Sequence, residues 1–159
     1  MGFISSNPIF NNVIFRMNGF RDRLLYENIE LSDENIFMVE PTIEGSYRDM
    51  KAILETRAEP MPTAIFAMND IVASGSMRAM DEHGINIPRD ISVIGMDNMP
   101  ICQLTNPPLT TIGVFKSEMG AEAVRELLLM IENEDDAHKI TYLGVRLVER
   151  GSVSVPKKM

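Results

Sequence analysis

The chain has 159 residues, 45% of them hydrophobic, and its 15 Lys and Arg against 23 Asp and Glu give a net charge of −8. The length is typical of one domain with its own core, and the apolar fraction excludes a disordered chain. Because phosphate contacts need clustered Lys and Arg, so acidic a chain is not expected to grip nucleic acid by itself. It has no apolar run of about 18 residues, so no membrane partner is expected.

The only cysteine, Cys102, cannot form an internal disulfide, so stability does not depend on an oxidising compartment. The first residues, Gly2 to Ser5, are typical of a strand and lack the charged and apolar regions of a signal peptide. Both observations predict a cytoplasmic protein. A strand that begins directly after Met1 also indicates a chain cut from something longer.

Apolar residues alternate along the chain between short runs and helical spacing. The short runs predict strands, in chain order, at 3–4, 36–39, 63–67, 91–95, 109–112 and 145–148. Helices are predicted between the first four runs, and a longer one over 120–131, before the last. Thr42 opens the second helix, Asn69-Asp70 caps the third, and Gly84 ends it. This order predicts a three-layer α/β/α fold with a mostly parallel, Rossmann-like or flavodoxin-like sheet.

Polar residues follow three of the predicted strands: Ser5-Ser6-Asn7, Asn69-Asp70 and Asp97-Asn98. Ligands of such sheets bind beyond the carboxyl ends of the strands, and Asn and Asp suit a ligand rich in hydroxyls or amides. The structural alternative is that Asn69 or Asp70 only caps a helix and that Asp97 only closes a turn. Arg16 lies near the same rim and could hold a carboxylate or a hydroxyl pair. From spacing alone, a solvated or salt-bridged Arg16 is the favoured interpretation.

Signatures of catalysis are missing from the sequence. It contains no GxGxxG, GxxxxGK[ST], HExxH or GxSxG pattern. His83 and His138 are predicted to be surface residues without a metal role, and Cys102 an inert thiol. The 13 methionines are expected to fill the core. The sequence therefore predicts no enzyme, no cofactor, no metal and no catalytic residue.

Six segments of the sequence form a recognisable set: 62–70, 84–98, 108–112, the Arg-x-x-Gly-Phe pattern of Arg16–Phe20, the late helix around 118–128 and the closing strand 147–152. Taken together, these segments resemble the LacI/GalR family of bacterial transcription regulators. They cover nearly the whole chain in order. The resemblance implies a periplasmic-binding-protein-like lobe that binds a small-molecule effector, a sugar, within a homodimer. It also implies that effector binding controls DNA binding by the intact protein.

The resemblance begins at the first strand of the second lobe of the family's effector-binding domain. It therefore implies that residues 1–159 are the C-terminal part of that domain, and that the DNA-binding helix-turn-helix and the first lobe are absent. The effector contacts implied are Arg16, Asn69 and Asp97. Asn12 and Pro41 stand at positions that often line the cleft, although Pro41 replaces an aromatic ring that some members stack on the ligand.

In the family the chain crosses back to the first lobe after the strand at 109–112, and a helix here spanning 116–132 packs on that lobe. Without it, the apolar stripe of this helix has no partner. We expect the helix either to fold back or to be exchanged with a second copy. The alternative function is a solute-binding protein of a sugar transport system, which shares the fold but requires an export signal. An enzyme of flavodoxin-like fold is a third hypothesis.

Overall fold

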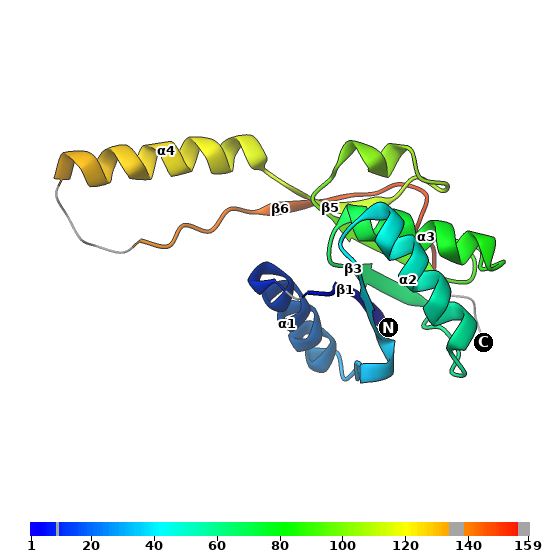
Figure 1. Cartoon of the computed structure of the whole chain (residues 1–159). Coiled ribbons are helices and arrows are strands. Elements are labelled where there is room, and N and C mark those ends of the chain that lie inside the picture. Colours follow the sequence, from blue (N-terminus) through cyan, green and yellow to red (C-terminus); the bar gives the residue numbers. More distant parts are fainter. Residues whose placement is uncertain (9, 134–138, 156–159) are drawn as a thin grey trace.

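A single six-stranded sheet forms the centre of the molecule (Figure 1). This computed structural model describes residues 1–8, 10–133 and 139–155. The strands lie in the order β2-β1-β3-β4-β5-β6, and all neighbours are parallel except β5 and β6. Their bounds are β1 Gly2–Ser6, β2 Ile36–Val39, β3 Ala64–Ala67, β4 Ser92–Met96, β5 Thr110–Val114 and β6 Val145–Val148. The prediction of a mostly parallel α/β sheet is confirmed, with strand ends displaced by a few residues.

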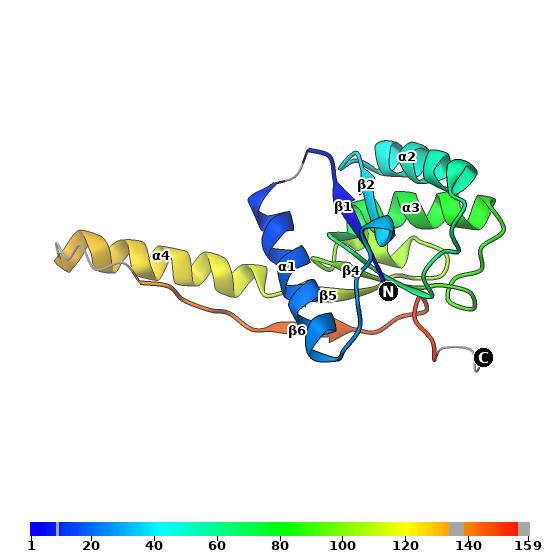
Figure 2. The ribbon, with the colours of Figure 1, turned by 90° about the horizontal axis from the view of Figure 1, so that it is seen from below.

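Helices cover both faces of this sheet, as predicted. They are α1 Asn11–Tyr26, α2 Ile43–Thr56, α3 Asp70–Glu82 and α4 Lys116–Asn133, with short 3₁₀ helices at Asp33–Asn35 and Pro100–Gln103. Figure 2 shows α1 on one face and α2 with α3 on the other. Under α1, the rings of Phe3, Phe20 and Phe66 lie 5.5–5.8 Å apart, centroid to centroid. These contacts fix α1, and with it Arg16, against the sheet.

Local signals in the sequence set the ends of the helices where they were predicted. The hydroxyl of Thr42 accepts a hydrogen bond from the Gly45 amide at 2.9 Å and caps α2. Asn69 caps α3 in the same way. Gly84 follows α3 with φ +79°, a conformation that glycine adopts without strain. Each prediction about these caps is confirmed.

The two helices of the second face approach each other closely at Gly75. A Cβ added to Gly75 would lie 2.1 Å from the hydroxyl of Ser46 and 2.2 Å from the carbonyl of Ile43. Only a residue without a side chain fits between these helices. This close packing holds the start of α3 in a fixed place beneath the rim of the sheet.

Helix α4 and the segment 139–144 that leads into β6 project from the sheet as a long arm in both views (Figures 1 and 2). The arm leaves β5 at the edge where the parallel strands end. The large apolar side chains of α4 are more than half exposed at Met119, Val124, Leu127, Leu128, Met130 and Ile131. Of the two arrangements expected for α4, folding back on the sheet does not occur here. Exchange with a second copy stays a prediction. None of the helices in the described residues is long and apolar enough to cross a membrane.

Candidate functional site

The rim is the side of the sheet at which the parallel strands end. It includes the point where the strand order reverses. From β1 the chain moves to β2 on one side, and β3 then pairs with β1 on the other side. The loops that leave β1 and β3 therefore diverge at their carboxyl ends, the place where open α/β sheets bind their ligands. The amino end of α1 and the amino end of α3 both lie at this edge, next to the loop that leaves β4.

Arg16 joins two of these loops. One guanidinium nitrogen donates to the carbonyl of Met68 at 2.6 Å, and the other donates to Oδ1 of Asp97 at 3.0 Å. The Arg16 and Asp97 side chains are 20% and 25% exposed, so the pair is shielded from water yet reachable by a ligand. The interpretation of Arg16 as salt-bridged is confirmed, and its partner is another predicted site residue.

Asn69 stands between this pair and α3. Its side-chain oxygen accepts a hydrogen bond from the Val72 amide at 3.0 Å, so the prediction that Asn69 caps the helix is confirmed. Capping uses only the oxygen of the amide, and its NH₂ group still has two donors for another partner. Arg16 binds the carbonyl of Met68, the residue before Asn69. The structure thus brings Arg16, Asn69 and Asp97 to one place.

The loop after β4 has an unusual backbone. Asp97 and Asn98 have φ values of +105° and +50°, a region that residues with side chains rarely occupy. The Asp97 amide donates to Ile112 at 2.8 Å, and Arg150 donates to the side-chain oxygen of Asn98 at 2.8 Å. Sequence reasoning missed Arg150 as a support of this loop. The only feature of the sequence that pointed to Arg150 was its place in the closing-strand segment 147–152.

Two serines of the first polar group do not belong to the rim. Ser5 and Ser6 are fully buried, because β1 continues through Ser6 and holds both residues within the sheet. The hydroxyl of Ser6 donates to the carbonyl of Pro8 at 2.8 Å. The prediction that these serines offer ligand contacts is therefore wrong. Asn7, which follows them, is exposed.

Asn12 and Pro41 form no hydrogen bond or ion pair with the Arg16–Asp97 pair within the described residues. Asn12 is exposed in the first turn of α1, on the same helical face as Arg16. Pro41 is half-buried after β2, the edge strand of the sheet. Beside it, a hydrogen bond from Arg48 lowers the pKa of the Glu40 carboxyl. The contacts described for the chain do not join Asn12 or Pro41 to Arg16, so their role stays a prediction.

A hollow of about 350 Å³ adjoins Asp97 at the base of the arm. Its lining combines acidic and basic side chains with an aromatic ring: Asp97, Asn98, Val114, Phe115, Lys116, Ser117, Glu118 and Arg146. It continues the rim from β4 to the first turn of α4. A polar ligand at this edge would meet charges of both signs.

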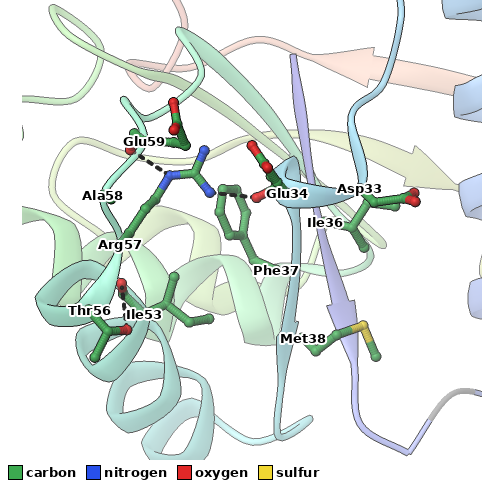
Figure 3. A pocket seen from close by; sticks show the side chains of 10 residues that line it. All are labelled: Asp33, Glu34, Ile36, Phe37, Met38, Ile53, Thr56, Arg57, Ala58 and Glu59. Atoms are coloured by element: carbon green, nitrogen blue, oxygen red, sulfur yellow. Dashed lines mark hydrogen bonds between the residues drawn. The ribbon is translucent and has the colours of Figure 1, made fainter.

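A second hollow, of about 460 Å³, lies at the opposite edge of the sheet (Figure 3). Arg57 and Phe37 both line this hollow, with the Arg57 guanidinium 5.3 Å from the centroid of the Phe37 ring. The same guanidinium donates to the carbonyls of Glu34, Glu59 and Pro60 and to the side chain of Asn35. Through these four hydrogen bonds, Arg57 fastens the end of α2 to the start of β2. This hollow is a by-product of that structural junction.

Cys102, His83 and His138 are the residues that the sequence offered for catalysis or metal binding. No group of three or more potential metal ligands occurs within the described ranges. Cys102 is buried. Its burial is the main cause that raises the pKa of the thiol to about 12, and a hydrogen bond to Asp70 is the second cause. A thiol protonated at neutral pH is not a nucleophile. His83 is exposed at the end of α3, and His138 lies outside the described residues.

The sequence profile of a periplasmic binding protein-like domain matches residues 2–153. The chain belongs to this family. It is 36% identical over 138 residues to the HTH-type transcriptional regulator MalR of Clostridium butyricum, covering 87% of this chain and 40% of that protein. It is 36% identical over 155 residues to the HTH-type transcriptional repressor PurR of Histophilus somni, covering 96% and 45%. The chain thus spans less than half the length of these relatives.

Solved structures of the periplasmic binding protein-like fold agree with this assignment. A LacI family transcriptional regulator from Enterococcus faecium with bound ribose matches with a TM-score of 0.81 and 31% identity, over 99% of this chain and 56% of that chain. A sugar-binding LacI family regulator from Escherichia coli matches with a TM-score of 0.83 and 28% identity, over 98% and 55%. The resemblance to LacI-type regulators and the predicted fold are both confirmed.

Proposed function

We propose that this chain is the effector-sensing and dimerisation portion of a LacI-type transcriptional regulator, acting in the cytoplasm. It binds a small molecule, a sugar, and so controls DNA binding by the intact protein. The Arg16–Asp97 pair with Asn69 beside it carries this proposal. These side chains place a guanidinium fork, a carboxylate and an amide at one reachable rim, which is the donor and acceptor set that binds vicinal hydroxyl groups.

The shape of this rim supports a site shared between two lobes. Its polar groups lie along one edge of the sheet, and the arm leaves from that same edge with an apolar helix surface exposed. A second lobe seated on α4 would both cover this apolar surface and close over Arg16 and Asp97. Binding of a sugar between the lobes would then favour a closed state and alter the DNA-binding part.

Transport is the alternative function for this fold. The named relatives are transcriptional regulators, and the neighbour with bound ribose is a LacI family regulator, which favours sensing over transport. The reading frame upstream of Met1 discriminates the two. A helix-turn-helix there supports the regulator, whereas an export signal supports a solute-binding protein.

Calorimetric titration with ribose, glucose, galactose, maltose and cellobiose tests the proposal. We expect weak binding or none to the 159-residue chain, and measurable binding once the chain is extended upstream to include the first lobe. The extended Arg16→Ala variant is the matched comparison and should lose most of the affinity. Tight binding to the 159-residue chain would contradict the shared site, and an extended chain that binds no small molecule would contradict sensing. Light scattering of the extended chain tests the homodimer.

A further inference from the structure

A carboxylate is buried directly beneath the rim. Asp70, the residue after the cap Asn69, is completely inaccessible to solvent. Its Oδ1 accepts a hydrogen bond from the hydroxyl of Thr111 at 2.5 Å, and its Oδ2 accepts one from the amide of Met99 at 2.7 Å. Burial of a carboxylate costs free energy unless such bonds compensate it. Its partners therefore indicate what this carboxylate holds in place.

Asp70 and Arg16 fasten the same two segments to each other. Arg16 bridges the carbonyl of Met68 and the carboxylate of Asp97, on the partly exposed side. Two residues further along each segment, Asp70 binds the amide of Met99, on the side of the core. The segments 68–70 and 97–99 are thus joined at both ends. Movement of one joint changes the geometry of the other.

The loop that Asp70 holds has the positive φ values of Asp97 and Asn98. Residues with side chains keep such a backbone only where surrounding contacts determine it. Besides the bonds of Asp70 to Thr111 and Met99, the Asn98 amide makes a long contact of 3.4 Å to the hydroxyl of Thr111. Asp70 and Thr111 together therefore set the course of the loop that carries Asp97.

Strand β4 also makes room for this carboxylate. A Cβ on Gly95 would lie 2.3 Å from Oδ1 of Asp70 and 3.0 Å from the side chain of Leu109. Since only glycine avoids this clash, Asp70 and β4 fit each other closely. The carboxylate has little freedom to take another position.

From this geometry we propose that Asp70 is a positioning residue of the effector site. It fixes the 97–99 loop so that the carboxylate of Asp97 stays opposite Arg16 and faces the sugar hydroxyls. Asp70 itself does not touch the ligand. This inference rests on the proposed function for the ligand, whereas the coupling between Asp70 and the Arg16–Asp97 pair is measurable without a sugar.

The decisive experiment uses the complete 159-residue chain labelled with ¹⁵N. In Asp70→Asn we expect the Met99 amide to exchange with solvent at least ~10-fold faster, because a side chain with one acceptor oxygen cannot serve both donors as before. We also expect the guanidinium signals of Arg16 to shift or broaden. Asp90→Asn is the matched control. Asp90 likewise accepts a hydrogen bond from a backbone amide, that of Asn86 at 2.9 Å. It precedes β4 and so lies at the amino end of that strand, away from the rim, and the Arg16 signals should be unchanged.

Thr111 supplies variants that keep the test decisive if Asp70→Asn fails to fold. Thr111→Val has nearly the same shape and removes one donor, and we expect it to shift the Arg16 signals in the same direction. Thr111→Ser retains the hydroxyl and should restore them. Arg16 signals that stay at their wild-type positions in folded variants with a released Met99 amide would overturn the inference.

A sugar separates this inference from the proposed function. If an upstream-extended chain binds ribose, Asp70→Asn should weaken binding at least ~10-fold at temperatures where the variant is folded. Unchanged ribose affinity would overturn the positioning role and leave sensing intact. Shifted Arg16 signals in a protein that binds no sugar would instead overturn the proposed function and support the coupling.

Discussion

The guanidinium of Arg16 lies 3.0 Å from the carboxylate of Asp97, a residue 81 positions later in the chain. The two side chains come from α1, which follows β1, and from the loop after β4, near the point where the strand order reverses. Each is only partly exposed, and Arg16 also binds the carbonyl of Met68. A ligand that engages this pair therefore engages three separate segments of the fold at once.

We predict that Arg16→Lys weakens the site although it keeps the charge. An ammonium group cannot reproduce the two diverging bonds of the guanidinium, so the Met68 and Asp97 contacts cannot both persist. Chemical denaturation should show a free energy of unfolding about 1 kcal/mol lower. Arg89→Lys is the control: Arg89 is exposed and pairs with the neighbouring Asp90, and its change should cost less than about 0.5 kcal/mol. Equal losses in both variants would contradict the special role of Arg16.

Gly75→Ala should destabilise the chain through the contact of α2 with α3. The new methyl group would collide with the Ser46 hydroxyl and the Ile43 carbonyl, and one of these is backbone. Overpacking of this kind costs about 1–3 kcal/mol, which thermal denaturation measures as a lower Tm. Gly19→Ala is the matched change in α1, where nothing lies within 4 Å of the new Cβ. It should stabilise the protein by about 0.5–1 kcal/mol, because alanine favours a helix.

Local patterns predicted the fold well, because each strand and cap depends on neighbouring residues. Thr42, Asn69 and Gly84 mark helix ends through bonds and φ values within a few positions. The contacts that build the site could not be predicted from local patterns in the same way. Thr111 in β5 and Arg150 just after β6 support the 97–99 loop from later in the chain, and no spacing rule relates them to Asp97. Ser5 and Ser6 were misassigned because the alternation of residues does not reveal where a fully buried strand ends.

Cys102 provides a prediction about pH. Burial and the neighbouring Asp70 raise the pKa of its thiol from 9.0 to about 12. The unfolded chain loses this proton near pH 9 and the folded chain keeps it, so stability falls as the pH rises from about 9 towards 12. Between pH 9 and 11 the free energy of unfolding should decline more steeply for the native sequence than for Cys102→Ala. The difference for one group is at most about 1.4 kcal/mol per pH unit.

Reactivity of the same thiol gives an independent measurement. Cys102 is the only cysteine in the chain, so a colourimetric thiol reagent reports on it alone. At pH 8 the folded protein should react far more slowly than the chain in denaturant, because the thiol is buried and protonated. Identical stability slopes for Cys102→Ala together with rapid labelling of the folded protein would contradict the raised pKa.

The exposed apolar surface of α4 predicts association of this chain in solution. Leu127, Leu128 and Ile131 are each more than half exposed, and burial of each against a partner would contribute about 1.5–3 kcal/mol. We expect light scattering to show a mass that rises with concentration, and the double variant Leu127→Lys, Ile131→Lys to remain monomeric. At dilutions where the native chain is also monomeric, the denaturation midpoint of the sheet should be the same in both, since α4 lies away from the sheet. Leu104→Lys changes an exposed leucine outside the arm and should leave the arm-dependent association intact. A native chain that stays monomeric at high concentration, with α4 open to solvent, would contradict exchange with a second copy.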